Sequence, residues 1–294
     1  MKGAPLRHAL EYAAYWPVAK LLRTLPHPAS RRLGAALGGL AHALDARRRR
    51  AARDNLRHAF PELPEVERRR MARRCYRHFG AAFCDALSAT RFDPVELCRR
   101  VTLVGLEHLL EAEARGRGVI VLSAHFGNWE IVPPMVALAS GPMASVGRPA
   151  DNPWVDREIQ ALRSRLGNRS IPKRGAVREL FRILGAGGRV GLLVDQRVRA
   201  EEGIDVPFFG RPALTSPIVA KLALRTGAAI VPAFGDHLPE GRYRVEFLPP
   251  ILAQGEDDEA TAFALTRRCL EVCEAVILRA PERWLWLHRR WKHG

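Results

Sequence analysis

Short apolar runs alternate with helical stretches from residue 101 onward, and this alternation constrains the fold more than any other feature of the chain. Strand, helix and strand repeated in this way indicate an α/β domain with a largely parallel sheet, whose functional loops lie at the carboxyl ends of the strands. We expect strands at 118–123, 143–147, 190–194 and 228–234, with helices near 128–138, 153–166, 176–184 and 216–225.

The end of the chain completes this domain. Residues 241–248 predict an antiparallel strand, 257–279 a closing helix, and 283–293 an aromatic, basic tail. The fold class that follows is α/β, with a largely parallel but mixed sheet flanked by helices.

The front of the chain is different, because residues 5 to about 99 have helical periodicity throughout, with a break at 60–64. We therefore expect residues 1–100 to form a helical, basic section and residues 101–294 to form the α/β section. No low-complexity linker separates the two, so they should pack as one unit.

Positive charge is concentrated in the helical section. The chain has 47 Lys+Arg against 31 Asp+Glu, a net charge of +16, and the first 100 residues carry 21 against 9, or +12. Such an excess favours an anionic partner: nucleic acid, acidic lipid or an acidic carrier protein. The arginines at 47–50 with Arg53 and Arg57 predict a dense positive face, unless that face is merely solvated. Because neither aromatic-basic interleaving nor a helix-turn-helix pattern is present, nucleic acid is the least favoured partner.

The cysteines and the apolar segments indicate the compartment. Five cysteines without a CxxC pair argue against a disulfide framework and a zinc ribbon, and favour a reducing environment. No stretch reaches the roughly 18 apolar residues of a membrane-spanning helix. Residues 1–25 instead resemble an amphipathic segment, with Tyr12, Tyr15 and Trp16 suited to a membrane interface. The alternative is a helix that packs on its own domain.

The stretch from Gly118 to Glu130 carries the most chemistry, since a buried strand runs directly into a polar loop. His125 lies at the carboxyl end of the strand, and Asn128 can cap the next helix, which places Glu130 in the first turn. A carboxylate that accepts one imidazole proton leaves the other nitrogen free to act as a general base. We therefore expect Glu130 to pair with His125, and the backbone N–H groups of Gly127 and Asn128 to be candidate donors to an oxyanion.

Ser123 offers a second chemistry, that of a hydrolase with a covalent serine nucleophile. It lies two residues before His125, on the same side of the strand. No nucleophile elbow surrounds it, and the required order of serine, acid and histidine is absent.

Polar residues also follow two other predicted strands. Arg148 comes after 143–147, and Asp195 with Gln196 ends 190–194, so all three should share the sheet edge of His125. Arg148 or Arg165 would suit an acceptor phosphate or the oxyanion, although either can be a surface arginine. Asp195 is a poor candidate for a metal ligand because no second carboxylate cluster lies nearby, so no metal or other cofactor is expected.

The segment from His125 to Glu130 matches the HX4E form of the HX4D/E acyltransferase motif, and the chain resembles the bacterial lipid A biosynthesis lauroyl/myristoyl acyltransferases of the lysophospholipid acyltransferase superfamily. The resemblance extends over nearly the whole chain. The supporting segments are Arg53-Asp-Asn55-Leu, Phe60-Pro61, Arg148-Pro, Asp151-Asn152-Pro153, Asp195-Gln196, Val206-Pro-Phe-Phe-Gly210 with Thr215, and Trp286-Leu-His-Arg-Arg290.

The resemblance implies a glycerolipid acyltransferase-like fold and transfer of a fatty acyl group from acyl carrier protein, or sometimes coenzyme A, to a hydroxyl of a lipid at the cytoplasmic face of the inner membrane. The acceptor is a lipid A precursor in some members and a phosphatidylinositol mannoside or another envelope lipid in others. Many members begin with a transmembrane helix, whereas charges interrupt the first 25 residues here, so peripheral or shallow attachment to anionic lipid is expected.

The resemblance also implies roles for individual residues. His125 is the general base and Glu130 its partner. The residues expected to bind substrate are Arg148, Asn152, Arg165, Asp195, Gln196, Phe208, Phe209 and Gly210.

Overall fold

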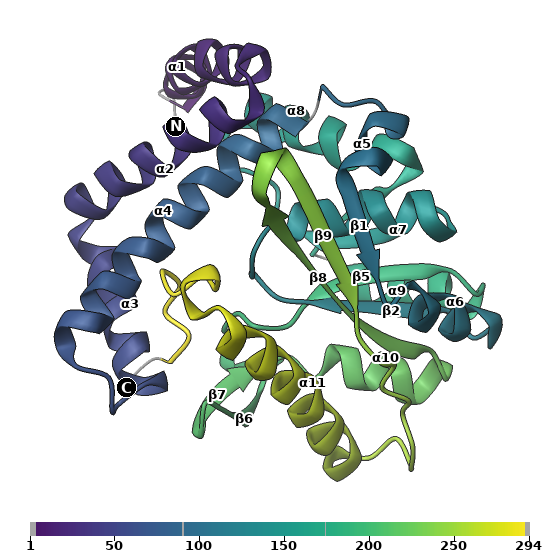
Figure 1. The fold of residues 1–294 in the computed structure, drawn as a ribbon. Helices are drawn as coiled ribbons and strands as arrows, with labels where there is room; N and C mark the ends of the chain where they lie inside the picture. The colour runs from purple at the N-terminus through teal and green to yellow at the C-terminus, as the bar shows by residue number, and fades with distance from the viewer. Residues whose placement is uncertain (1–3, 90, 174, 292–294) are drawn as a thin grey trace.

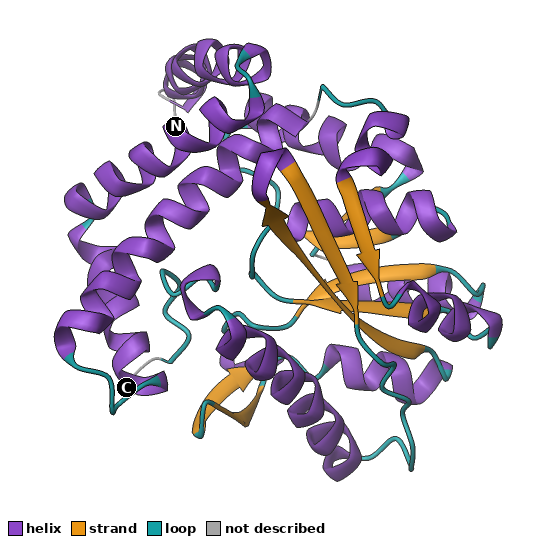
Figure 2. Cartoon of the chain, in the orientation of Figure 1, coloured by secondary structure: helices purple, strands orange, loops and turns teal. Residues whose placement is uncertain are grey.

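The computed structural model describes residues 4–89, 91–173 and 175–291 (Figure 1). A central sheet carries helices on both faces, and a group of long helices stands to one side of it (Figure 2). The helices of eight or more residues and the shorter α5 are α1 Ala4–Thr24, α2 His27–Leu44, α3 Ala46–Ala59, α4 Glu65–Ala89, α5 Pro94–Arg100, α6 Leu106–Ala114, α7 Val132–Ser140, α8 Pro153–Arg163, α9 Ala176–Gly185, α10 Ile218–Thr226 and α11 Glu259–Arg279.

The main sheet has seven strands in the order β1-β9-β8-β2-β5-β3-β4. All of its neighbouring pairs are parallel except β8 with β9, so the predicted mixed, largely parallel sheet is confirmed. A separate antiparallel hairpin is formed by β6 and β7. The strands are β1 Val101–Val104, β2 Val119–Ser123, β3 Ala144–Gly147, β4 Arg169–Pro172, β5 Arg189–Leu193, β6 Ile204–Phe208, β7 Arg211–Thr215, β8 Ala229–Leu238 and β9 Arg242–Phe247.

Side-chain alternation along β2 explains the layers. Val119 and Val121 point to one face and pack in a hydrophobic cluster with α5, α6 and α7, whereas Ile120 and Leu122 point to the other and pack with α9, α10 and α11. A strand that is buried on both faces has the continuous apolar sequence seen here.

The strands predicted from the sequence did not include the edge strands β1 and β4 or the β6–β7 hairpin. Thr102, Arg169 and Ser170 interrupt the edge strands, so neither reads as an apolar run. Short polar strands of this kind are typical of sheet edges, where one side of the backbone has no partner strand.

The helical section is closely packed, both within itself and against the α/β section. Gly38 of α2 lies so close to α4 that a Cβ there would collide with the carbonyl oxygen of Tyr76. Ala52 and Leu56 of α3 and Cys75 of α4 join the same buried cluster as the sheet. The division at residue 100 stays a prediction.

The first helix has two unlike sides. Leu22 is fully buried, and Arg23 forms an ion pair of 2.6 Å with Glu158 of α8, while Leu6, Leu10 and Leu21 are exposed. Among the described residues, no helix is long and apolar enough to cross a bilayer.

Candidate active site

His125 and Asp195 lie at equivalent positions beyond two neighbouring parallel strands. In the pairing of β2 with β5, Ser123 lies opposite Leu193. Two residues beyond these positions the chain reaches His125 after β2 and Asp195 after β5. His125 Nδ1 consequently lies 2.9 Å from Asp195 Oδ1. Sheet register therefore brings the two side chains together although they are far apart in the sequence.

The carboxylate of Asp195 is buried, and two further N–H groups donate to it. The backbone N–H of His125 donates to Oδ2 at 2.9 Å, and the indole N–H of Trp284 donates to the same oxygen at 2.7 Å. Burial raises the pKa of Asp195, but the His125 side chain and these hydrogen bonds offset that effect and hold the pKa below its ordinary value. Asp195 is therefore ionised at neutral pH.

An ionised Asp195 fixes the imidazole tautomer with the proton on Nδ1, which leaves the lone pair on Nε2. The side-chain amide nitrogen of Gln196 lies 3.2 Å from that Nε2, and the ring of Trp129 meets the imidazole edge-on at 5.1 Å. His125 and Gln196 both line a cleft of about 510 Å³. The arrangement can take a proton from a hydroxyl that enters the cleft.

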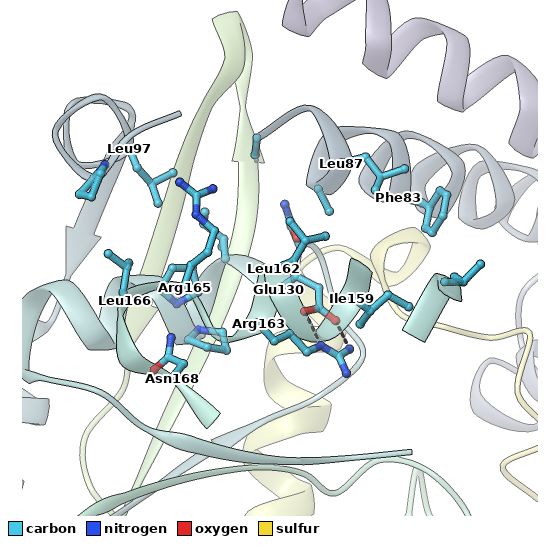
Figure 3. A pocket seen from close by; sticks show the side chains of 18 of the residues that line it. Phe83, Leu87, Leu97, Glu130, Ile159, Leu162, Arg163, Arg165, Leu166 and Asn168 are labelled. Carbon is cyan, nitrogen blue, oxygen red and sulfur yellow. Dashed lines mark hydrogen bonds and ion pairs between the residues drawn. The ribbon is translucent and has the colours of Figure 1, made fainter. Parts of the chain in front are cut away.

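Glu130 does not pair with His125 as expected. It lies in a short 3₁₀ helix, Trp129–Ile131, where Arg163 of α8 donates to its two oxygens at 2.5 and 3.2 Å (Figure 3). The indole N–H of Trp129 also donates to Glu130 at 3.1 Å. Asp195 already occupies the Nδ1 side of the imidazole, so the expected contact is corrected: the carboxylate on His125 comes from the loop after β5 and not from the HX4E segment.

The two expected oxyanion donors are already used within the fold. The N–H of Gly127 donates to the carbonyl oxygen of Arg283 at 2.9 Å, and the N–H of Asn128 donates to that of Gly235 at 2.8 Å. Gly127 has a φ of +59°, and a Cβ there would collide with the Gly235 carbonyl. The glycine is therefore explained by the close approach of β8 rather than by a ligand.

The side chain of Asn128 also differs from the expectation, because it does not cap a helix. Its amide donates to the buried carboxylate of Asp85 at 3.2 Å. This contact fastens the loop after β2 to α4.

The arginines and the asparagine proposed for substrate binding are dispersed. Arg148 follows β3 and lines the cleft, where it pairs with Asp151 at 2.7 Å. Arg165 lines a different, apolar cavity and donates to the carbonyl oxygen of Phe92 at 2.6 Å.

Asn152 lies away from both cavities and has a local role. Its side chain accepts hydrogen bonds from the first turn of α8 and donates to the His8 carbonyl oxygen at 2.8 Å. Capping α8 and tying it to α1 already use its amide, so substrate binding by Asn152 stays a prediction that its contacts do not support.

Phe208, Phe209 and Gly210 form the turn of the β6–β7 hairpin and lie outside the lining of both cavities. Phe208 is fully buried and stacks on Trp291 at 5.7 Å. Phe208 is therefore committed to the core, whereas Phe209 is half-buried and Gly210 is exposed, and substrate binding by this turn stays a prediction.

The apolar cavity, of about 290 Å³, lies among α4, α5, α7 and α8 (Figure 3). The cleft beside His125 shares Glu130, Pro133, Arg163 and Asn168 with it, so the Glu130–Arg163 ion pair stands where the two spaces meet. The remaining apolar side chains of the cavity include Phe83, Leu87, Leu97, Ile159, Leu162 and Leu166.

The cleft itself is rich in basic side chains, some of which are partly neutralised. Lys173 pairs with Glu202 at 2.6 Å, and Arg169 pairs with Glu179 at 2.8 Å. Cations gathered in a cleft raise the local concentration of anions. The basic side chains that line it are Arg148, Arg163, Arg169, Lys173 and Arg197.

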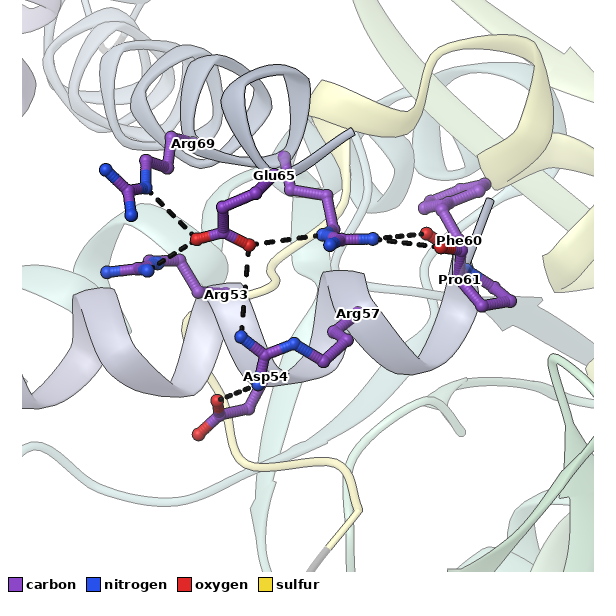
Figure 4. Close-up of polar contacts among 8 residues, drawn as sticks. Arg53, Asp54, Arg57, Phe60, Pro61, Glu65 and Arg69 are labelled. Carbon is purple, nitrogen blue, oxygen red and sulfur yellow. Dashed lines mark hydrogen bonds and ion pairs between the residues drawn. The ribbon is translucent and has the colours of Figure 1, made fainter. Parts of the chain in front are cut away.

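A second basic cluster lies at the junction of α3 and α4 (Figure 4). Arg53, Arg68 and Arg69 donate to the carboxylate of Glu65 at 2.5 to 3.4 Å, and Arg57 lies within 3.9 Å. Hydrogen bonds from these arginines lower the pKa of Glu65 to about 2. Part of the predicted positive face is therefore an internal brace between the two helices.

Sequence reasoning missed Arg163 and Trp284, which both contact residues of the site. Arg163 falls within a predicted helix, but helical period does not reveal what its side chain contacts. Trp284 lies in the predicted aromatic tail. The sequence offered no other role for that tail, and this was the available signal that its side chains contact the site.

The family model for bacterial lipid A biosynthesis acyltransferases matches residues 1–293. The chain is 30% identical to the lipid A biosynthesis lauroyltransferase of Escherichia coli (strain K12), over 97% of this chain and 94% of that protein. It is also 25% identical to a phosphatidylinositol mannoside acyltransferase of Mycolicibacterium smegmatis, over 96% and 90%.

Among solved structures, a 1-acyl-sn-glycerophosphate acyltransferase from Thermotoga maritima superposes with a TM-score of 0.40 at 16% identity. The match covers 85% of this chain and 98% of that one.

Proposed function

Because the chain is an acyltransferase that belongs to the bacterial lipid A biosynthesis acyltransferase family, we propose that it transfers a fatty acyl group from an acyl carrier protein thioester to a hydroxyl of a lipid A precursor. The observation that carries this proposal is the His125–Asp195 pair, 2.9 Å apart, on the wall of a cleft lined with cations. A base, a cleft for an anionic acceptor and an adjoining apolar cavity are the three parts that such a reaction needs.

The chemical step uses His125 as a general base. Nε2 removes the proton of the acceptor hydroxyl as its oxygen attacks the thioester carbonyl, and the tetrahedral intermediate collapses with loss of the carrier thiolate. The imidazolium then gives its proton to that sulfur. Asp195 stabilises the imidazolium, and a general base of this kind is worth about 10² to 10⁴ in rate.

Arg163 is the group that we assign to the oxyanion. It lines both cavities, so it faces the place where a thioester carbonyl lies when its chain occupies one cavity and the acceptor the other. Although burial lowers the pKa of Arg163, the hydrogen bonds that it donates to the Glu130 carboxylate raise the pKa above its ordinary value, and the side chain stays charged. Glu130 of the HX4E motif thereby acts on Arg163, the residue assigned to the oxyanion, rather than on the base His125.

The apolar cavity is the proposed site of the acyl chain. It is lined mainly by aliphatic and aromatic side chains, among them Tyr15 of α1 and Phe83 of α4. Phe83 is 60% exposed although it is a large apolar side chain. An exposed aromatic group on the wall of the cavity suits an apolar ligand that arrives from a lipid surface.

The cleft is the proposed site of the phosphorylated head group of the acceptor. Arg148, Arg169, Lys173 and Arg197 line it, and cations in such a cleft attract phosphate groups. Asp195 and Gln196, which were expected to bind the acceptor, have their side chains on His125 instead, so the attacking hydroxyl takes the place of the Gln196 amide at Nε2.

The helical section is proposed to provide attachment to the cytoplasmic face of the inner membrane and docking of the carrier. Exposed apolar side chains continue from α1 onto α2 at Leu37, Leu40 and Leu44, which suits an interface helix. The exposed arginines Arg47 and Arg50 at the start of α3 supply the positive charge that an anionic lipid surface or an acidic carrier protein would recognise.

The test is a transfer assay with defined substrates. Purified enzyme is mixed with lauroyl acyl carrier protein and either a phosphorylated glucosamine disaccharide lipid or a phosphatidylinositol mannoside, and the lipid products are analysed by mass spectrometry. One added acyl chain on the disaccharide lipid supports the proposal. An added chain on the mannoside alone replaces the acceptor by the alternative that the mycobacterial relative suggests, and no added chain on either lipid contradicts the proposal.

A further inference from the structure

A short piece of the C-terminal tail, residues 283–288, holds the loop that carries His125. The carbonyl oxygen of Arg283 accepts the N–H of Gly127 at 2.9 Å, and the N–H of Leu285 donates to the His125 carbonyl oxygen at 3.0 Å. Phe126 and Trp284 pair between these two hydrogen bonds as an antiparallel bridge. The tail thus runs alongside the site as one more strand-like segment.

Trp284 is fixed within this segment. It is 2% exposed, and its ring packs against Phe208 at 5.5 Å and perpendicular to Trp286 at 4.5 Å. With the ring held by its neighbours, its indole N–H is directed at Asp195 Oδ2, 2.7 Å away.

We propose that Trp284 is a positioning residue of the acyl-transfer centre, whose indole N–H fixes the Asp195 carboxylate and, through it, the tautomer and orientation of His125. The inference rests on the proposed function, because it concerns the same base. Oδ2 receives two donors, the indole and the His125 backbone, so Oδ1 is the oxygen presented to Nδ1. Removal of the indole N–H leaves Oδ2 with one of these donors and a carboxylate that can rotate.

Arg290, His288 and Cys273 also lie near the pair. Arg290 donates to the Leu214 carbonyl oxygen at 2.7 Å and to the Thr215 hydroxyl at 2.5 Å, and His288 accepts the backbone N–H of Arg197 at 3.2 Å. The thiol of Cys273 on α11 stays protonated, because burial raises its pKa well above the ordinary value. These groups surround Asp195 without taking the place of the indole.

The chain offers a matched control in Trp286. Its ring is also fully buried, but its indole N–H donates to the Pro281 carbonyl oxygen at 2.6 Å and not to the pair. Trp284→Phe and Trp286→Phe therefore remove the same atoms from the same packed tail, and they differ in whether Asp195 loses a donor.

The experiment measures the imidazole tautomer directly. In protein with ¹⁵N-labelled histidine, the His125 signals are assigned by their loss in His125→Gln, and their shifts give the fraction of Nδ1–H tautomer without any substrate. We expect that fraction to fall in Trp284→Phe and to stay at the wild-type value in Trp286→Phe.

Kinetics provide a second measurement on the same variants. In Trp284→Phe, kcat should fall about tenfold with unchanged KM, as expected for loss of one hydrogen bond to a charged group.

An unchanged tautomer fraction in Trp284→Phe, or an equal change in both variants, overturns the proposal. If Trp284→Phe does not fold, 3-benzothienylalanine incorporated at position 284 keeps the shape of the side chain and lacks the N–H, and the same outcomes apply to it. Since the tautomer is measured without substrate, a failure of the acyl-transfer proposal would be seen separately, as an absence of lipid product.

Discussion

His125 and Asp195 are separated by 70 residues in the chain, yet the imidazole Nδ1 lies 2.9 Å from a carboxylate oxygen of Asp195. Glu130, five residues from His125 in the HX4E motif, faces Arg163 instead. The two acidic residues therefore have different partners. We infer that Asp195 acts on the base, whereas Glu130 acts on the cation at the junction of cleft and cavity.

Because Glu130 is paired with Arg163 and Asp195 with His125, we expect Glu130 and Arg163 to act as a unit. Arg163→Lys and Glu130→Gln should each lower kcat by about 10² to 10³, the cost of losing one oxyanion donor. The double variant should be little worse than either single variant, because both changes disable the same guanidinium. Initial rates of lipid acylation measure this, and multiplicative losses would show that the two residues act independently.

Filling the apolar cavity should change the preferred donor. In Ile159→Phe the larger side chain occupies part of the cavity, so kcat/KM should fall for long-chain acyl carrier thioesters by about fourfold for each methylene that no longer fits, with short chains spared. Val177→Phe on the exposed side of α9 is the control and should leave chain preference unchanged. Equal rates for all chain lengths in Ile159→Phe would place the acyl chain elsewhere.

Acid should destabilise the protein through His78, whose ring lies 3.0 Å from the Gly127 carbonyl oxygen. Burial lowers the pKa of His78 from 6.5 to about 4. Between these two values the unfolded chain binds a proton and the folded chain does not, so the stability is complete above about pH 6.5 and falls as the pH drops toward 4, by about 3 kcal/mol.

The measurement is urea unfolding at about pH 7.5 and about pH 4.5. His78→Gln keeps a donor for Gly127 but does not titrate, so the difference in unfolding free energy between the two pH values should be smaller than in the wild type. His237, whose pKa burial lowers to about 3, still contributes in the variant. If the difference in unfolding free energy is the same in His78→Gln as in the wild type, burial does not lower the pKa of His78 in the folded protein.

The contact between α2 and α4 should tolerate no side chain at Gly38. Gly38→Ala forces a Cβ against the Tyr76 carbonyl oxygen and should lower the unfolding free energy by about 1 to 3 kcal/mol. At Gly39 the nearest atom to a new Cβ is the Arg77 guanidinium at 3.6 Å, so Gly39→Ala should raise the unfolding free energy by up to about 1 kcal/mol. Chemical denaturation compares the two, and equal effects would contradict the close packing.

The strands that carry the site were predictable because their signals are local. The apolar run before His125 and the one before Asp195 both identify buried strands, and the rule that functional loops follow such strands placed both residues at one sheet edge. Which carboxylate meets the imidazole was not predictable, because it depends on the order β2-β5 in the sheet and on the register of Ser123 with Leu193.

Other unexpected contacts share that cause. Gly127 and Asn128 have the sequence of a ligand-binding loop, but their N–H groups are taken by the carbonyl oxygens of Arg283 and Gly235, which lie more than a hundred residues further along the chain. Phe208 reads as a pocket residue because the sequence does not show that Trp284 and Trp291 enclose it. The hydrophobic periodicity of the sequence predicts the helices and strands, whereas hydrogen-bond partners follow from tertiary packing.

The most direct test of the account is the single-turnover rate constant for acyl transfer from acyl carrier protein to the lipid acceptor in His125→Ala and Asp195→Asn. We predict a fall of about 10² to 10⁴ in His125→Ala and a smaller but clear fall in Asp195→Asn, with acceptor binding retained in both. Rate constants within a few-fold of the wild type in both variants would contradict the assignment of this pair as the acyl-transfer centre.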